Sequence, residues 1–242
     1  MEIEAWGQTD VGLVRSINQD TILVDKNLGL FIVADGMGGH KGGEVASAMA
    51  VETVREIVEN AKNEGIKLSP REVLAHAYRE ASLRIYHKSS KENPELQGMG
   101  TTMVAALAKG NTMYIANVGD SRAYLFKDPE MWQVTEDHSL VSEQIRAGII
   151  SEKEAEQVAT RNVITRSVGY EPEVPVDIIE RQMHRGEMLL MCSDGLTGMV
   201  SDIEIAGICK NESHDLVVSR CVEAAKRGGG DDNISVILLK IQ

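Results

Sequence analysis

Four aspartates that are far apart in the chain each adjoin an apolar run, and this arrangement constrains the fold more than any other feature of the sequence. Asp35 lies in IVADGMGGH, Asp120 in IANVGDSR, Asp194 in LMCSDGL and Asp232 in GGGDDNISVIL. An apolar run beside such residues is typical of a strand that meets a turn. Taken alone, each Asp-Gly pair is an ordinary turn signal. Taken together, they predict that four carboxylates converge on one metal site.

The ligand type indicates which metals such a site would hold. Hard divalent cations such as Mg²⁺ and Mn²⁺ prefer oxygen ligands, and two of them side by side need several shared or neighbouring carboxylates. The cysteines Cys192, Cys209 and Cys221 lack the close Cys/His pairs of zinc sites and stand among apolar neighbours. We therefore expect reduced core cysteines and a metal site built from oxygen atoms.

Length and charge narrow the class of protein. The 242 residues contain no Pro/Ser-rich linker or break in composition, so one domain, 1–242, is expected. A net charge of −12 and a pI near 5.0 argue against nucleic acid, which such a surface repels except at a local cationic site. The N-terminus MEIEAWGQTD has no basic start or apolar stretch, and no segment is long enough for a bilayer. We expect a cytoplasmic protein without a membrane partner.

The first half of the chain predicts strands followed by two helices. Strand signals occur at 2–6, 21–24 and 30–34, and the last is nearly all apolar, as in a buried strand. Apolar positions from Val45 to Ala61 fit a helix that Gly65 can end. A second helix should begin after Ser69, because Ser69 and Glu72 form a capping box around Pro70 at the first helical position.

The segment 101–134 changes to short apolar runs separated by KGN, GDS and KDPE, which predicts an antiparallel meander with Asp120 at a sheet rim. Residues 137–168 return to helix, with Ser151 and Glu154 as another capping box. This polar stretch, about 140–168, predicts a mobile flap over the site, although a plain surface excursion fits equally well. Later elements are expected at 174–179 (strand), 188–192 (strand), 213–226 (helix) and 234–241 (strand).

The segments that carry these signals resemble a known family. RSINQD, VADGMGGH, QGMGTTMV, NVGDSRAYL, TEDHSL, MCSDGLTGMV and GGGDDNISVILL are similar, in order, to the motifs of bacterial metal-dependent serine/threonine phosphatases of the 2C type. The resemblance spans nearly the whole chain. It implies an α+β fold, a four-layer α-β-β-α sandwich in which two antiparallel sheets are flanked by helix pairs, with metals at one end between the sheets. The expected order of elements agrees with this architecture.

The resemblance also implies metal ligands. The residue matching Asp35 bridges two metals, the carbonyl of Gly36 helps to bind one, and Asp194 and Asp232 bind the other. Asp20 matches an acidic position that acts near the first metal through water, and Asp120 matches a ligand of a third, weaker metal, although Asp120 could instead only cap its turn. This chain has Gln19 where animal members have a glutamate. Asp231 falls at the family's variable position, directly before the expected ligand Asp232.

Two further residues are candidates for catalysis. Arg15 matches the family's phosphate-binding arginine, and its planar fork of donors suits two phosphate oxygens; a lone arginine is otherwise usually a surface residue. His40 follows the bacterial DGMGGH pattern and could orient water or substrate, or simply bond backbone. Animal members have a histidine where this chain has Met37, so a metal-bound water is the preferred acid. His138, His184, Thr101 and Thr102 are expected to be structural.

The function implied is hydrolysis of phosphoserine and phosphothreonine on proteins by a metal-bridged hydroxide. The cofactors implied are two or three Mn²⁺ or Mg²⁺ ions. Phosphorylated proteins, and a cognate serine/threonine kinase, would be the partners of a monomer. One alternative is a partner-switching phosphatase that acts on a phosphorylated regulator of transcription. The other is a module that binds phosphoproteins without hydrolysis, which would be expected to lack at least one of the central carboxylates.

Overall fold

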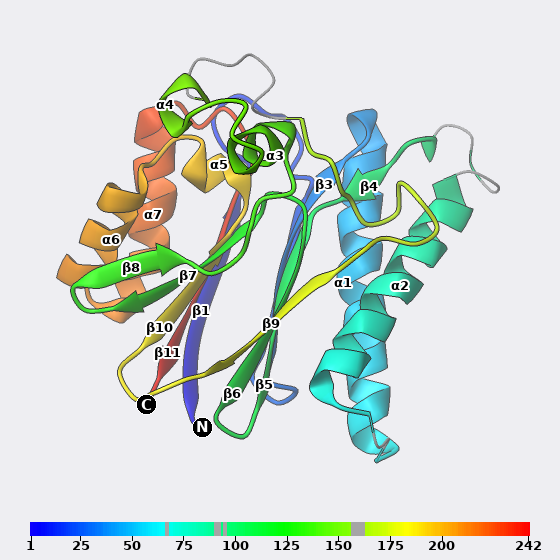
Figure 1. Ribbon diagram of the computed structural model, residues 1–242, viewed down its shortest axis with the longest axis horizontal. Coiled ribbons are helices and arrows are strands. Elements are labelled where there is room, and N and C mark those ends of the chain that lie inside the picture. The colour runs from blue at the N-terminus through cyan, green and yellow to red at the C-terminus, as the bar shows by residue number, and fades with distance from the viewer. Residues whose placement is uncertain (66–67, 90–92, 94–95, 156–162) are drawn as a thin grey trace.

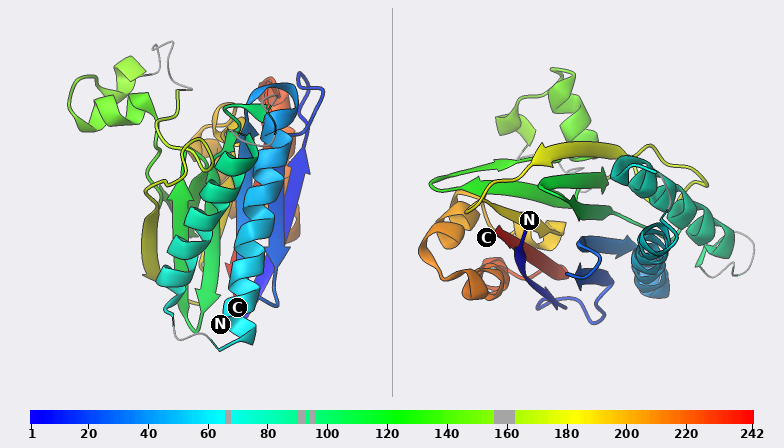
Figure 2. Two further views of the ribbon diagram at one scale, coloured as in Figure 1. Left: turned by 90° about the vertical axis from the view of Figure 1, so that its right-hand side faces the viewer. Right: turned by 90° about the horizontal axis from the view of Figure 1, so that it is seen from below.

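The computed structural model describes residues 1–65, 68–89, 93, 96–155 and 163–242. Two antiparallel sheets pack face to face, and helices cover both outer faces (Figure 1). The view from below in Figure 2 separates the layers. The α+β sandwich implied by the resemblance is therefore confirmed.

The first sheet has the order β1 (Ile3–Asp10), β11 (Ile234–Ile241), β10 (Met188–Cys192), β7 (Arg122–Lys127) and β8 (Glu130–Gln133). The second has the order β2 (Asp20–Asp25), β3 (Leu30–Met37), β5 (Met103–Lys109), β6 (Thr112–Val118) and β9 (Asp177–Gln182), and β4 (Gly100–Thr101) pairs with β3. Helices α1 (Gly39–Asn63) and α2 (Pro70–His87) pack on the second sheet, and α6 (Asp202–Asn211) and α7 (His214–Gly228) on the first.

Strand β3 shows why an unbroken apolar run forms a central strand. Leu30 and Ile32 pack under α1 and α2, whereas Phe31 and Val33 belong to the core between the sheets. Successive side chains of a strand point to opposite faces, so a strand that is covered on both faces needs apolar residues at every position. Asp35 directly follows this run and is thereby held near the end of a rigid strand.

The expected antiparallel meander from 101 to 134 is wrong as a single sheet. Strands β5 and β6 pair in the second sheet, whereas β7 and β8 pair in the first. The chain crosses between the sheets at Gly119. Its φ of 104° is a conformation that glycine adopts far more readily than other residues, and an added Cβ there would lie 2.5 Å from the Thr102 Cβ. The crossing places Asp120 at the rim, as expected, but between two sheets.

Helix starts follow their sequence signals. Before α2, the Ser69 N–H donates to Glu72 Oε2 at 2.7 Å, and the Glu72 N–H donates to Ser69 Oγ at 3.3 Å. The same reciprocal pair, Ser151 and Glu154, begins α4 (Glu152–Ala155). Within the described ranges, no helix combines the length and the apolar content that a bilayer span requires.

The buried Tyr78 fixes α2 to the second sheet, and Tyr78→Phe is expected to lower the free energy of unfolding by about 1 to 2 kcal/mol. Its hydroxyl lies 3.1 Å from the Met103 carbonyl oxygen and 2.9 Å from that of Ala116. Urea denaturation measures the change. Tyr170→Phe, at a site that is 64% exposed, is the matched control. Equal stability of the Tyr78→Phe variant and the parent protein would contradict this role.

Candidate functional site

A cavity of about 530 Å³ lies where strand ends of the two sheets meet. Asp35 lies near the end of β3 in the second sheet, Asp194 follows β10 of the first, and Asp232 precedes β11. Asp120, in the crossing between the sheets, lines the same cavity. All four aspartates that stand out in the sequence therefore face one space.

The backbone of Asp35 is held from both directions. The Thr101 hydroxyl and the Thr102 N–H donate to the Asp35 carbonyl oxygen at 2.7 and 2.9 Å, and the Asp35 N–H donates to Thr102 Oγ1 at 3.3 Å. Burial raises the pKa of the Asp35 carboxyl well above its ordinary value, and the charges of Asp20 and Asp194 raise it further. Burial also raises the pKa of the Asp194 carboxyl, and the charge of Asp232 raises it further.

Burial and nearby negative charges also raise the pKa of two other carboxyls, those of Asp20 and Asp120. Burial, opposed by serine hydroxyls and reinforced by the charges of Asp194 and Asp232, raises the pKa of Asp20 to about 6. Burial and the neighbouring Asp194 raise that of Asp120 to about 7. Asp20 Oδ1 and Asp194 Oδ1 are buried oxygens without a hydrogen-bond partner among the described residues. Buried polar atoms are rarely left in this state, so a cation would relieve both the orphaned oxygens and the repulsion.

The carboxylates currently bond to local donors. The Ser193 hydroxyl donates to Asp20 Oδ2 at 2.8 Å, and the Asn233 N–H donates to Asp232 Oδ1 at 2.8 Å. Accordingly, no three His, Cys, Asp or Glu side chains in the described part of the chain form a ready metal-binding group. The set of oxygen donors fits hard divalent cations in its chemistry. Full coordination requires some of these side chains to leave their present partners.

Close backbone packing requires a glycine at position 36, the first glycine of the DGMGG motif. A Cβ at Gly36 would lie 2.0 Å from the Gly43 carbonyl oxygen and 2.6 Å from that of Gln19. The beginning of α1 therefore packs, through Gly43, directly on the backbone beside Asp35, at a distance that only glycine allows. Gly36 lines the cavity, as its expected role requires. The side chain of His40, in the same turn, lies outside the described residues.

Arg15 reaches the cavity from the loop between β1 and β2. Its Nη2 donates to Asp232 Oδ2 at 2.7 Å, and the guanidinium remains about half exposed. Among the described residues that line the cavity, Arg15 is the only cation. A donor fork that is partly open to solvent beside a carboxylate cluster is suited to bind an anion that enters the cavity.

Asn233 is a positioning residue that the sequence reasoning did not single out. Its side-chain amide donates to the carbonyl oxygens of Val11 and Ile17, both at 3.0 Å, and its Oδ1 accepts the Gln19 N–H at 2.8 Å. One side chain thus fastens both ends of the loop that carries Arg15. The signal for this residue in the sequence was the pair Asp232–Asn233 in the segment GGGDDNISVILL.

Asn233→Ala is expected to remove about 2 to 3 kcal/mol of stability and most of the activity, because three buried or half-buried backbone groups lose their partner. Asn211→Ala is the matched control, since the Asn211 amide bonds only the Gly207 carbonyl oxygen of its own helix among the hydrogen bonds of the described residues. Thermal unfolding and turnover should be compared for both. If the two variants behave alike, the fastening role is wrong.

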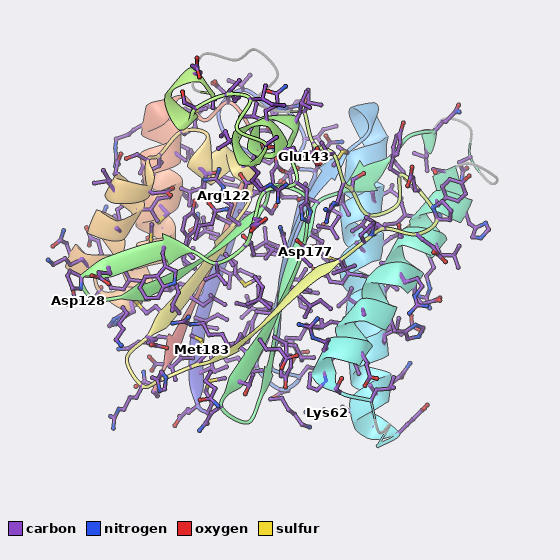
Figure 3. All side chains as sticks on the ribbon, in the orientation of Figure 1. Lys62, Arg122, Asp128, Glu143, Asp177 and Met183 are labelled. Atoms are coloured by element: carbon purple, nitrogen blue, oxygen red, sulfur yellow. The ribbon has the colours of Figure 1, made fainter. Side chains whose placement is uncertain are left out.

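The excursion between β8 and β9 is anchored beside Asp120. It contains α3 (Leu140–Arg146) and α4, and residues 156–162 of the expected flap lie outside the described residues. His138, at its base, is fully buried, and its Nδ1 accepts the Gly119 N–H at 3.1 Å. Burial lowers the His138 pKa, which favours the neutral ring that can accept this bond. Figure 3 shows Glu143 of α3 at the same end of the molecule as Arg122.

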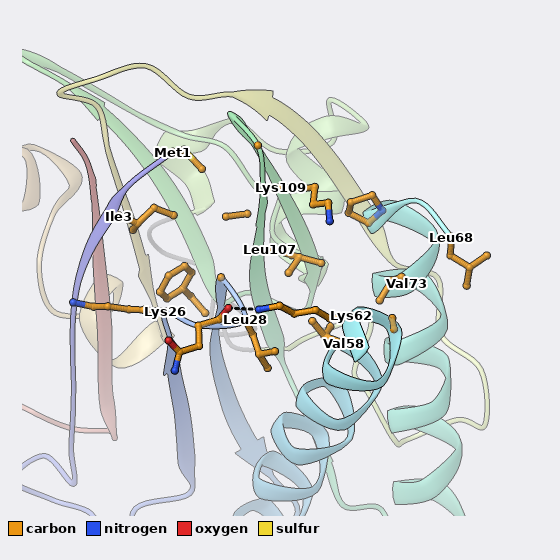
Figure 4. A pocket seen from close by; sticks show the side chains of 17 residues that line it. Met1, Ile3, Lys26, Leu28, Val58, Lys62, Leu68, Val73, Leu107 and Lys109 are labelled. Atoms are coloured by element: carbon orange, nitrogen blue, oxygen red, sulfur yellow. Dashed lines mark hydrogen bonds between the residues drawn. The ribbon is translucent and has the colours of Figure 1, made fainter. Parts of the chain in front are cut away.

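A second cavity, of about 430 Å³, lies at the opposite end of the sandwich (Figure 4). Apolar side chains such as Phe31, Leu28 and Leu107 line it, together with Lys26, Lys62 and Lys109. It contains no carboxylate among its described lining residues, and the Lys62 ammonium donates to the Asn27 carbonyl oxygen at 2.5 Å. The chemistry of the aspartates therefore belongs to the first cavity.

Comparisons with known proteins agree with this geometry. Residues 14–227 match the family described as protein phosphatase 2C. The chain is 39% identical over 244 residues to the serine/threonine phosphatase stp of Listeria monocytogenes, covering 96% of this chain and 94% of that protein. The crystal structure of the Mycobacterium tuberculosis serine/threonine phosphatase PstP/Ppp superposes with a TM-score of 0.91 at 32% identity, covering 99% of both chains. The catalytic domain of PstP in complex with two manganese ions superposes at 0.86, with 32% identity and 99% coverage of both chains.

Proposed function

The chain belongs to the protein phosphatase 2C family and is a serine/threonine protein phosphatase, and we propose that it hydrolyses phosphoserine and phosphothreonine by metal-assisted attack of water on phosphorus. The observation that carries this mechanism is the convergence of Asp35, Asp120, Asp194 and Asp232 on one cavity. In addition, one buried oxygen of Asp20 and one of Asp194 have no hydrogen-bond partner in the described part of the chain. These residues fit a binuclear site for hard cations.

We propose that two Mn²⁺ or Mg²⁺ ions, with a third near Asp120, occupy the cavity, as a PstP structure contains two manganese ions. When bound, such ions act as Lewis acids that lower the pKa of a shared water molecule and neutralise charge on the phosphoryl group. Asp35 would be the shared ligand, assisted by the Gly36 carbonyl. Asp194 and Asp232 would hold the second ion, and Asp20 would act from the β2 end.

The protein's own residues supply binding and orientation. Arg15 is placed to take two phosphate oxygens and thereby to hold the phosphorus in line with the attacking oxygen. The described residues that line the cavity include no Cys, His, Lys or Tyr. The cavity thus favours direct transfer to water over a covalent intermediate on one of these residues.

We further propose that one domain with a flap at about 140–168 acts as a cytoplasmic monomer and reverses the work of a serine/threonine kinase. Cys192, Cys209 and Cys221 are buried and free, which suits a reducing compartment. The side chain of His40 is proposed to orient substrate or water near α1.

The mechanism is tested by p-nitrophenyl phosphate turnover in manganese, in magnesium and with a chelator. We expect activity only with added metal, and hydrolysis of phosphoserine and phosphothreonine peptides. Turnover that is unaffected by chelation would contradict the metal mechanism. Binding of a phosphopeptide without any phosphate release would instead favour the non-enzymatic alternative.

A further inference from the structure

We propose that this phosphatase prefers phosphoserine or phosphothreonine with apolar residues beside it, because apolar side chains, most of them exposed, line the carboxylate cavity or directly adjoin its lining residues in the chain. This preference concerns the same site and rests on the proposed hydrolysis. The side chains, called the apolar collar, are Leu13, Val14, Ile17, Val163 and Ile164.

The collar concentrates apolar surface at one place. Val14, Ile17 and Ile164 line the cavity itself, and Leu13 and Val163 are their chain neighbours. Leu13 is 62% exposed, Val14 68%, Ile17 41% and Val163 46%. Single exposed apolar residues need no explanation, but several around a cavity mark a binding surface.

The loop that carries three of these residues is held rigidly while their side chains face solvent. The Leu13 and Val14 N–H groups donate to the Gly230 carbonyl oxygen at 2.8 and 3.3 Å. Gly12 packs so closely that a Cβ there would lie 2.2 Å from the Asp232 carbonyl oxygen. Together with the Asn233 amide bonds, these contacts order the loop before substrate arrives. A preorganised apolar surface binds without the entropic cost of ordering.

The second part of the collar is anchored independently. The Leu140 N–H donates to the Val163 carbonyl oxygen at 2.8 Å, and Ser139 and Ile164 form an isolated antiparallel bridge. Both are backbone contacts, and the Val163 side chain is 46% exposed. The collar therefore borders the cavity from the β1–β2 loop and from the base of the excursion.

Charge at the mouth disfavours acidic neighbours of the phosphoresidue. Arg15 is the one cation among the described lining residues, and it is assigned to the phosphate. An acidic flanking residue would thus lose water without gaining a cationic partner among the described lining residues. An aliphatic flanking residue buried against Val14 and Ile17 would gain about 1.5 kcal/mol, which is about a tenfold increase in kcat/KM.

Three phosphothreonine peptides, identical except for leucine, serine or aspartate on both sides of the phosphothreonine, test this preference in manganese. We expect the highest kcat/KM for leucine flanks, about tenfold above aspartate flanks. In Val14→Ser, the kcat/KM for the leucine-flanked peptide divided by that for the serine-flanked peptide should fall about threefold. The same ratio should also fall in Val163→Ser. Ile203→Ser is the matched control, because Ile203 is 86% exposed at the start of α6.

Equal kcat/KM for the three peptides, with manganese-dependent turnover of p-nitrophenyl phosphate intact, would overturn the preference and leave the proposed function standing. The preference would also be overturned if this kcat/KM ratio of leucine to serine flanks did not fall in either Val14→Ser or Val163→Ser, or if it fell equally in Ile203→Ser. No turnover of any substrate by the parent protein would overturn both the preference and the proposed function.

Discussion

Asp35→Asn is expected to lower metal-dependent turnover by about a thousandfold or more while the fold is retained. The substitution keeps the size of the side chain but removes the charge that would be shared by two cations. A loss of about 4 kcal/mol of transition-state stabilisation corresponds to this factor. Burial and neighbouring carboxylates raise the pKa of Asp35, so the neutral amide should also make the metal-free protein more stable.

Two measurements separate this role from a structural one. Manganese should raise the thermal midpoint of the parent protein, because it binds the folded state, and this rise should be lost in Asp35→Asn. Asp231→Asn is the matched control: it removes the same charge from an exposed carboxylate one residue before Asp232. Near-normal turnover of Asp35→Asn, or an unchanged response to manganese, would refute the assignment of the bridging ligand.

Arg15→Ala is expected to lower kcat/KM for phosphopeptides about a hundredfold, mainly through a higher KM. A charged pair of hydrogen bonds to phosphate accounts for about 2.7 kcal/mol. Manganese affinity should not fall, since the substitution removes a partner that now occupies Asp232 Oδ2. Arg15→Lys should recover part of the activity, because an ammonium keeps the charge but not the planar fork. Steady-state kinetics measure kcat/KM for the phosphopeptides, and calorimetric titration measures the affinity for manganese.

Arg71→Ala provides a closely matched control. Arg71 also forms a half-exposed ion pair, with Glu180 at 2.8 Å, but on the outer surface of α2 and β9. Its loss should leave the kinetics unchanged. Equal substrate constants for Arg15→Ala and the parent protein would place the phosphate elsewhere in the cavity.

The sequence predicted the elements whose local signals agree with their surroundings. Strands β10 and β11 begin and end where their apolar runs do, and α2 begins at the capping box of Ser69. Strand β3 runs on to Met37, beyond the expected Ala34, because β4 pairs with Gly36 and Met37. Helix α1 begins at Gly39, well before Val45, since the close packing of Gly36 and Gly43 lets the helix start at the turn.

Other features depend on contacts that a sequence pattern does not contain. The crossing at Gly119 could not be distinguished from a hairpin turn, because both need a glycine and a polar neighbour. Helix α6 was missed, although Ser201 caps it. Thr101 and Thr102 were predicted to be structural, and their bonds to Asp35 make them supports of the site. The convergence of four carboxylates was predictable; the hydrogen bonds that hold them were not.

The position of β11 between β1 and β10 has a consequence during protein synthesis. Asp10 pairs with Ile234, so Asp232 and Asn233 take their places only when β11, which is made after β1 and β10, inserts between these two strands. Until that insertion, the polypeptide lacks one proposed cation ligand and the Asn233 hydrogen bonds that hold the Arg15 loop. Newly made molecules would therefore remain inactive until β11 has paired with both β1 and β10.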